Sequence, residues 1–400
     1  MRHDGVMAIG AVSSLPTAGG IFELIRRGEV RTRSEVVEAT GLSRTAVTAR
    51  LGALLDSGLI IERDGEESTG GRPPTLLEFN AAAGAVFAVA IGRSRTQLAV
   101  CDLSGAVLAS AETDHPDGVG PDELFHRVRA ELDGLLRQAG VPIDRVRGVG
   151  LSLPAIVDPS TATCLEAPVM RGWDGVALAP YFADLDGVVV HVENDSKALA
   201  LSEVGGHLRQ HPDLVVLKAS TGLGCGAFSA GQLIRGSHGS AGEIGHSKSP
   251  AATGRPCRCG EVGCLEAVAA GWALVQESTA AGVALAHVRD LVALAQDGDA
   301  DARRRIRESG RRVGEAIATV INLLNPSALV VGGDLAGAYD LFVAGLRETL
   351  YASAAAWTSN DLVILPTTHG EAAGRVGCAQ LAVADVLGEA AVNRLMAQRG

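Results

Sequence analysis

A segment in the middle of the chain combines one histidine with three cysteines. His246, Cys257, Cys259 and Cys264 lie within nineteen residues, in the stretch GHSKSPAATGRPCRCGEVGC. Three thiolates and one imidazole form a ligand set that binds Zn²⁺ tetrahedrally, and four protein ligands leave no position open for a catalytic water. The spacing therefore predicts a structural zinc site, and it favours that site over a redox-active Cys-x-Cys pair.

The remaining composition is typical of a soluble intracellular protein. Hydrophobic residues make up 47% of the chain and charged residues 20%, and no apolar run approaches the roughly 20 residues that a membrane span needs. The first residues lack the sustained apolar core of a signal peptide. We expect a cytoplasmic protein with no membrane partner and with a flexible N-terminus over residues 1–18.

Charge and cysteine counts exclude two further classes. The seven cysteines are an odd number, and the four outside the cluster are scattered, which argues against a disulfide framework. The formal net charge of −11 argues against a protein that coats nucleic acid along its whole surface. Residues 1–80 hold nine arginines against eleven acidic residues, so this segment is not basic either. Any DNA contact must therefore come from a few cations placed on one local face.

The first eighty residues carry the start and stop signals of three short helices. The first helix contains Ile21 and ends at Gly28, where the chain needs a residue free of a Cβ. Thr32 with a glutamate three residues later has the form of a capping box, and that second helix ends at Gly41. Ser43 caps a third helix. A short helix, a glycine turn and a longer helix predict a helix-turn-helix.

The third helix separates an apolar stripe from a polar face. Its apolar residues are Val47, Leu51, Leu54 and Leu55. The residues that we expect to contact DNA lie near the start of the helix and off this stripe: Ser43, Arg44, Thr45, Thr48 and Arg50. A recognition helix presents such side chains near its start to base edges and phosphates. The alternative is a helical hairpin with a solvated polar face.

Two strand-like runs after this helix favour DNA binding over the plain hairpin. Residues 59–63 and 75–79 alternate as a strand pair, which is the wing of a winged helix. Between them, Gly70–Pro74 forms a stiff tip in which Arg72 carries the cation suited to a narrow minor groove. We therefore predict a winged helix-turn-helix DNA-binding domain over residues 19–80.

From Gly84 onward the pattern changes to short β-rich runs separated by helices. The order strand, strand, strand, helix, strand predicts an α/β lobe of the actin-like, ribonuclease-H type, and the same order returns later in the chain. We expect two such lobes within residues 81–400. The first would comprise about residues 81–195 with a C-terminal helix at about 375–398, and the second about residues 196–374. A cleft between the lobes would bind a ligand.

The ordered motifs GVGLSLPAIVD, VENDSKALALSE, STGLGCGAFSAGQLIRGSHGSAGEIGH and NLLNPSALVVGGD resemble the ROK family of repressors, open reading frames and sugar kinases. The resemblance covers about Gly19 to Leu387 and is strongest to the branch of sugar-responsive transcriptional regulators with an N-terminal winged helix. It implies a double-stranded DNA operator, a sugar or sugar-phosphate effector, and a homodimer or homotetramer.

The resemblance also implies a set of sugar-contacting residues. They are Asn194, Asp195, Glu243, His246 and Glu266. In the sugar kinases of the family the aspartate is the base that activates the attacking hydroxyl, and a carboxylate beside an amide suits a polyol physically. The alternative is a group of solvated loop residues, which are common without any ligand.

The phosphate side departs from the kinase pattern. The family's kinases have an aspartate followed by Gly-Gly-Thr, where this chain has Ala90, Ile91, Gly92, Arg93 and Ser94. A methyl group cannot coordinate hydrated Mg²⁺, and an arginine would crowd the phosphate path. The later loop 220–224 and the pair 332–333 keep their glycines. We expect no enzyme activity, and Asp195 would remain only as a hydrogen-bond acceptor.

These observations predict a repressor of carbohydrate-metabolism genes whose zinc-braced, kinase-like domain senses a sugar. His246 would bind zinc through one ring nitrogen and a ligand hydroxyl through the other. The first alternative is an active ATP-dependent sugar kinase fused to a DNA-binding domain, against which Ala90 and Arg93 argue. The second is a zinc-stabilised interaction module, which leaves the carboxylates without a role. Val169 stands where many family members have asparagine, so the pocket can differ in ligand.

Overall fold

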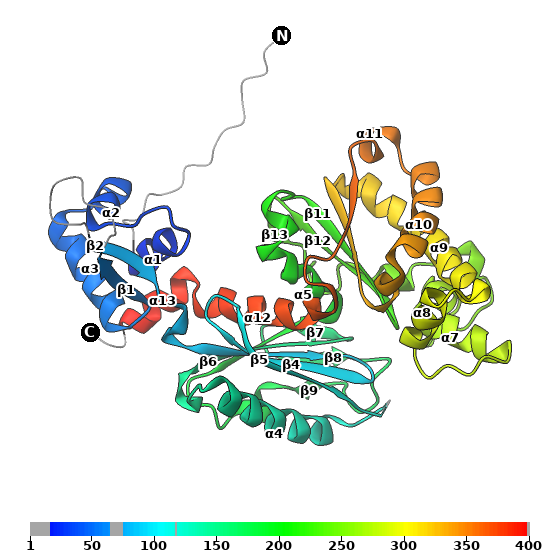
Figure 1. Ribbon diagram of the computed structural model, residues 1–400, viewed down its shortest axis with the longest axis horizontal. Coiled ribbons are helices and arrows are strands. Elements are labelled where there is room, and N and C mark those ends of the chain that lie inside the picture. The colour runs from blue at the N-terminus through cyan, green and yellow to red at the C-terminus, as the bar shows by residue number, and fades with distance from the viewer. Residues whose placement is uncertain (1–16, 65–74, 117, 398–400) are drawn as a thin grey trace, which may run out of the picture. The chain divides into compact units, whose positions relative to one another are not determined.

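A computed structural model describes residues 17–64, 75–116 and 118–397 (Figure 1). The chain divides into two compact units, Met1–Ala83 with Ala384–Gly400, and Gly84–Val383. The sequence-based division differs from this one in placing a helix at about 375–398 with the first lobe. The expected tip Gly70–Pro74, with Arg72, and residues 1–16 of the expected flexible N-terminus lie outside the described residues. No helix among the described residues is long and apolar enough to cross a membrane.

The first unit contains three helices and a two-stranded antiparallel sheet. The elements are α1 (Ala18–Arg26), α2 (Arg33–Thr40), α3 (Arg44–Asp56), β1 (Ile60–Asp64) and β2 (Thr75–Phe79). The Thr32 hydroxyl accepts the Glu35 N–H at the start of α2. The Glu35 carboxylate accepts the N–H of Arg31, not that of Thr32, so the capping box forms in one direction only. Gly41, at φ +68°, ends α2 in a left-handed conformation that glycine adopts without strain.

The core of this unit includes a helix from the far end of the chain. Helix α13 (Glu389–Ala397) packs against α1. The N–H of Gly19 donates to Asn393 Oδ1 at 2.8 Å. A Cβ at Gly19 would lie 2.4 Å from the carbonyl oxygen of Glu389. The two helices approach this closely only because residue 19 is glycine.

The second unit begins with a five-stranded mixed sheet in the order β10-β6-β3-β4-β5. Its strands are β3 (Ala85–Ile91), β4 (Arg95–Asp102), β5 (Val107–Asp114), β6 (Val146–Leu153) and β10 (Val189–Asn194). Helix α4 (Pro121–Ala139) covers one face and α12 (Ala373–Val386) the other (Figure 1). Gly150 allows this packing, because a Cβ there would lie 1.8 Å from the carbonyl oxygen of Cys378. The predicted order of three strands, a helix and a strand is confirmed.

A second five-stranded mixed sheet has the order β13-β12-β11-β14-β15. Its strands are β11 (Leu214–Ala219), β12 (Leu223–Ser229), β13 (Gln232–Leu233), β14 (Ala328–Gly332) and β15 (Val363–Pro366). The helices of this half are α5 (Asp195–Leu201), α6 (Glu266–Ala269), α7 (Gly271–Ala280), α8 (Val288–Gln296), α9 (Ala300–Leu324), α10 (Tyr339–Ser353) and α11 (Ala356–Ser359). Two mixed sheets after an N-terminal helical region confirm the predicted α/β class.

A small sheet that packs with the first half has no counterpart in the sequence analysis. It consists of β7 (Ile156–Asp158), β8 (Thr163–Glu166) and β9 (Val176–Ala177). Strands of two to four residues are too short to show an alternating pattern. The fully buried Trp173 lies in the turn that precedes β9 and packs into the core of the first half.

Candidate functional site

A cavity of about 840 Å³ lies in the second unit, where strands of both five-stranded sheets end. Ligands of open α/β sheets bind beyond the carboxyl ends of strands. The five residues that the family resemblance assigns to sugar contacts all line this cavity: Asn194, Asp195, Glu243, His246 and Glu266. The structure therefore brings together side chains that are up to 72 residues apart in sequence (266 − 194).

The amide of Asn194 is committed to the start of α5. Its Oδ1 accepts the N–H groups of Ser196 at 2.9 Å and Lys197 at 3.4 Å, and its Nδ2 donates to the carbonyl of Ala155 at 3.3 Å. Asn194 is thus the N-cap that orients Asp195, the first residue of the helix. The cap fixes the position from which the aspartate faces the cavity.

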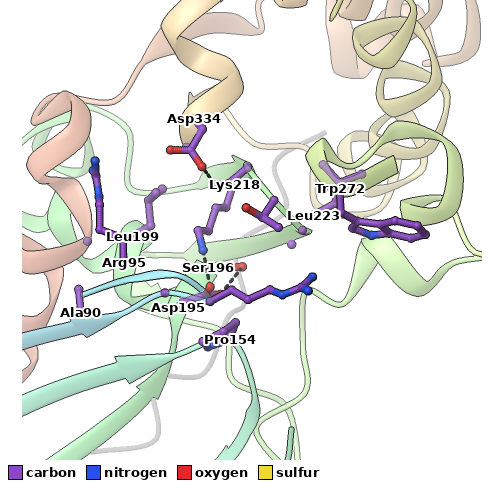
Figure 2. Close-up of a pocket in the computed structure, with 18 of the residues that line it drawn as sticks. Ala90, Arg95, Pro154, Asp195, Ser196, Leu199, Lys218, Leu223, Trp272 and Asp334 are labelled. Atoms are coloured by element: carbon purple, nitrogen blue, oxygen red, sulfur yellow. Dashed lines mark hydrogen bonds and ion pairs between the residues drawn. The ribbon is translucent and has the colours of Figure 1, made fainter. Parts of the chain in front are cut away.

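Lys218 forms an ion pair with Asp195 that the sequence analysis did not anticipate. Figure 2 shows the two side chains meeting in the cavity, with Lys218 extending from β11. Their side chains are 22% and 15% exposed. A cation next to the expected base neutralises its charge. The available signal was a single lysine inside the apolar run LVVLKAS, which by itself indicates no particular partner.

Two glutamates also line the cavity, Glu266 buried and Glu243 half-buried. Glu266 Oε1 accepts the N–H of Leu223 at 2.7 Å, and its Oε2 accepts the indole N–H of Trp272 at 3.3 Å. Burial raises the pKa of Glu243, and the nearby carboxylates of Asp195 and Glu266 add to that effect. Lys197 and His246 oppose it. Carboxylates held in this way can accept hydrogen bonds from ligand hydroxyls.

The stretch from Ala90 to Ser94 also lines the cavity. No carboxylate occupies the position of Ala90 at the end of β3, and Arg93 adds a cation to the same hairpin. Ser94 Oγ hydrogen-bonds to His287 Nε2 at the start of α8. The glycine-bearing loop 220–224 and Gly333, at φ +92°, form other parts of the lining.

The histidine and the three cysteines come together at the edge of this cavity. Their ligand atoms all lie within 4.8 Å of one another. Cys257 Sγ is 3.9 Å from His246 Nδ1, and Cys259 Sγ is 3.9 Å from Cys264 Sγ. Sulfur ligands about 2.3 Å from a tetrahedral zinc would be about 3.8 Å apart, so the donor set fits that metal. Burial raises the pKa of Cys257 to about 12, so a cation is needed to hold its thiolate.

The candidate DNA-contacting residues lie at the start of α3. Ser43 caps the helix by accepting the N–H of Ala46, and Arg44, Thr45 and Thr48 are exposed. Arg50 is half-buried and donates from Nη1 to the carbonyl of Ala46 at 3.4 Å. The residues that α3 buries are Val47, Leu51 and Leu54, whereas Leu55 is only partly buried.

The profile of the ROK family matches residues 86–385. The chain is 24% identical over 381 residues to the xylose repressor of Caldicellulosiruptor bescii, covering 92% of this chain and 95% of that one. The crystal structure of a ROK family transcriptional regulator, a homolog of the E. coli MLC protein, superposes with a TM-score of 0.79 at 27% identity. That match covers 95% of this chain and 98% of the regulator.

A ROK family glucokinase from Streptomyces griseus, solved with glucose and AMPPNP, has a TM-score of 0.63 at 28% identity. It matches 75% of this chain and 99% of the kinase. The regulator structure therefore matches a further fifth of this chain that the kinase does not match. The chain therefore belongs to the ROK family, and within that family it is a transcriptional regulator. The curated relative is a repressor and not a kinase.

Proposed function

We propose that this regulator represses carbohydrate-metabolism genes in the cytoplasm and that its cavity binds a sugar or sugar phosphate. One observation carries the proposal: an amide, an imidazole and three carboxylates line a single cavity in a chain that also has an N-terminal winged helix. Polyols are recognised by rigidly placed donors and acceptors of this kind. The repressor named above is a xylose repressor, which supports a sugar as effector.

The cavity is proposed to sense its ligand and not to phosphorylate it. Phosphoryl transfer needs a carboxylate that is free to accept the proton of the attacking hydroxyl, and oxygen ligands for Mg²⁺ near the nucleotide phosphates. Asp195 is paired with Lys218, and Ala90 offers no oxygen. Arg93 adds a side chain where the family's kinases have glycine. These three features support a binding site that has lost transfer chemistry.

The cysteine cluster is proposed to hold a structural Zn²⁺. Four protein ligands complete a tetrahedral shell, so the metal would stabilise the loop between His246 and Cys264 and would not activate water. His246 also lines the cavity, and its Nδ1 is the ring nitrogen nearest Cys257. Its Nε2 is then the nitrogen available to a ligand hydroxyl.

DNA recognition is proposed to use α3 in the major groove. Arg44, Thr45 and Thr48 would contact bases or phosphates, with Ser43 and Arg50 at the edges of that surface and Arg72 of the wing in the minor groove. A homodimer or homotetramer would place two winged helices on half-sites spaced by whole turns of DNA. Effector binding between the two sheets would favour one arrangement of the halves and so change operator affinity.

A gel-shift titration with the protein's own promoter region and a panel of sugars and sugar phosphates tests the proposal. A coupling free energy of about 1–3 kcal/mol would change operator affinity about 5- to 150-fold. Glu266→Gln should abolish that change. Glu261→Gln is the matched control, because Glu261 is an exposed residue of the same loop that does not line the cavity. A panel with no effect on either DNA affinity or thermal stability would refute the sugar-sensor proposal.

A further inference from the structure

One wall of the cavity is built from two residues that no motif singles out. Trp272, in the first turn of α7, is 8% exposed and lines the cavity. Arg258, from the cysteine loop, also lines it and places its Cζ 4.5 Å from the centre of the indole ring. A guanidinium at this distance over an aromatic face forms a cation–π contact. In Figure 2 the indole of Trp272 lies beside Leu223, at the edge of the site.

The indole also determines the position of a carboxylate. Its N–H donates to Glu266 Oε2 at 3.3 Å, while the N–H of Leu223 holds Oε1 at 2.7 Å. Two glycines make room for this side chain and let the backbone pack closely around it: a Cβ at Gly245 would lie 2.7 Å from Glu266 Cγ, and one at Gly222 would lie 2.8 Å from Oε1. Each carboxylate oxygen keeps a second lone-pair direction. Glu266 is therefore held in one orientation with acceptor capacity left for a ligand.

Arg258 connects this arrangement to the metal site through the backbone. It stands between Cys257 and Cys259, two of the four clustered ligand residues. The loop around it is closed by the Cys257 N–H bond to the Glu261 carbonyl at 2.7 Å. Binding both neighbouring thiolates to one metal would fix the backbone of Arg258, and thereby the place of its guanidinium over Trp272.

We infer that Trp272 is a positioning residue for Glu266, and that Arg258 transmits the metal-bound state of the cysteine loop to Trp272. The site therefore binds the hydroxyl of a polyol with full affinity only when the cysteine loop holds its metal. Only the hydroxyl part of the inference rests on the proposed sugar-binding function. The contact between Arg258 and Trp272 is independent of any ligand.

Tryptophan emission gives a readout that needs no sugar. The chain has three tryptophans, of which Trp173 is fully buried and Trp357 is 96% exposed. In a Trp357→Phe background, emission changes on removal of zinc by a chelator report mainly on Trp272. We expect a red shift as Arg258 leaves the indole face. Before chelation, Arg258→Gln should already emit at the longer wavelength, and chelation should shift its emission almost no further. Arg255→Lys changes an exposed residue of the same loop and should respond to the chelator as the parent does.

Measurements of sugar affinity test whether Trp272 positions Glu266. We expect Trp272→Phe, which keeps an aromatic ring and loses the N–H, to weaken D-xylose or D-glucose binding about tenfold by calorimetry. Zinc content and sugar-free operator affinity should not change. Chelation should weaken sugar binding more in the parent than in Arg258→Gln, in which only the loss of His246 positioning remains. Parental sugar affinity in Trp272→Phe, or an equal chelator effect on emission in Arg258→Gln and the parent, would overturn the inference.

The two arms separate the possible failures. If neither sugar binds the parent protein, the proposed ligand class fails for those sugars, and the emission arm still decides whether Arg258 couples the loop to Trp272. If sugar binds but the emission of Arg258→Gln responds to chelation as the parent does, the sugar-binding proposal stands and the coupling is wrong. Far-ultraviolet circular dichroism identifies any variant that has not folded.

Discussion

Replacing Lys218 by methionine tests whether the ion pair in the cavity contributes to stability. Methionine keeps much of the length of the side chain and removes the charge, so it leaves the carboxylate of Asp195 without its cation. Breaking a fully buried pair costs about 3–5 kcal/mol, whereas an exposed pair contributes about 0–1 kcal/mol. The side chains of Lys218 and Asp195 are 22% and 15% exposed. A value between these limits, about 2 kcal/mol lost on Lys218→Met, follows from that burial.

A double-mutant cycle isolates the interaction itself. Urea unfolding would be compared for the parent, Lys218→Met, Asp195→Asn and the double variant. We expect the double variant to lose about 1–2 kcal/mol less unfolding free energy than the two single variants lose together, because each single change already removes the pair. Additivity within about 0.3 kcal/mol would show that the pair does not form in solution and would refute the reasoning.

The same variant separates two features that are proposed to prevent phosphoryl transfer. Removing Lys218 leaves Ala90 without a metal-binding oxygen and Arg93 in the phosphate hairpin. We therefore expect Lys218→Met to show no hexose-dependent ATP hydrolysis in a coupled assay. Turnover by this single variant would mean that the lysine alone suppresses transfer, and that the phosphate stretch is not degenerate in function.

Three other predictions concern separate parts of the molecule. Burial raises the pKa of Glu243 above its usual value of 4.5. The folded state therefore binds the proton more tightly than the unfolded state, and parental stability falls as pH rises above about 4.5. Glu243→Gln should accordingly unfold at higher urea than the parent at pH 7 and at equal urea near pH 4, while its sugar affinity decreases. Cys259→Ser should lower zinc affinity by more than about 100-fold in a chromogenic chelator assay, and should impair sugar response while leaving sugar-free operator binding intact. Arg44→Ala should weaken operator binding and reduce the slope of log affinity against log salt by about 1 if Arg44 contacts a phosphate.

Matched controls accompany these variants. Glu261→Gln should leave the pH dependence of stability unchanged, since Glu261 is exposed and outside the cavity. Cys225→Ser changes a buried cysteine outside the cluster and should keep the zinc. Parental zinc affinity in Cys259→Ser would contradict the proposed ligand set. Unchanged operator affinity in Arg44→Ala at every salt concentration would remove Arg44 from the DNA surface.

The parts of the fold that could be predicted from the sequence are those specified by local chemistry. Thr32, Gly41 and Ser43 mark helix ends because caps and left-handed positions accept few residue types. The cysteine cluster could be predicted because three cysteines and a histidine within nineteen residues match the number and the types of ligands that zinc prefers. The five cavity residues were predicted only through the family resemblance, since nothing in their spacing brings residues 194 and 266 together.

The missed residues act through contacts that are distant in sequence. Lys218 meets Asp195 across 23 positions, and Arg258 meets Trp272 across 14. Neither contact follows from the periodicity of a helix or a strand, because each depends on where two separate elements end. Helix α13 was expected as part of a C-terminal helix, but its docking on α1 depends on the missing Cβ of Gly19. Nothing in the sequence distinguishes Gly19 from the rest of the 50 glycines as a point where two helices approach closely.

The division of the chain restricts how a ligand in the cavity can influence DNA binding. The chain passes between the two units at two places, Ala83 to Gly84 and Val383 to Ala384. The second crossing lies inside α12, whose first turn includes Gly374 at the cavity. Beyond it, α13 holds the winged helix through the bond from Gly19 to Asn393. Because α12 runs as one helix from the cavity across the second crossing to Val386, whereas the first crossing is a short connection between Ala83 and β3, we expect α12 to be the better of the two candidate routes. Asn393→Ala should therefore reduce the effect of sugar on operator affinity more than it reduces either sugar affinity or sugar-free operator affinity.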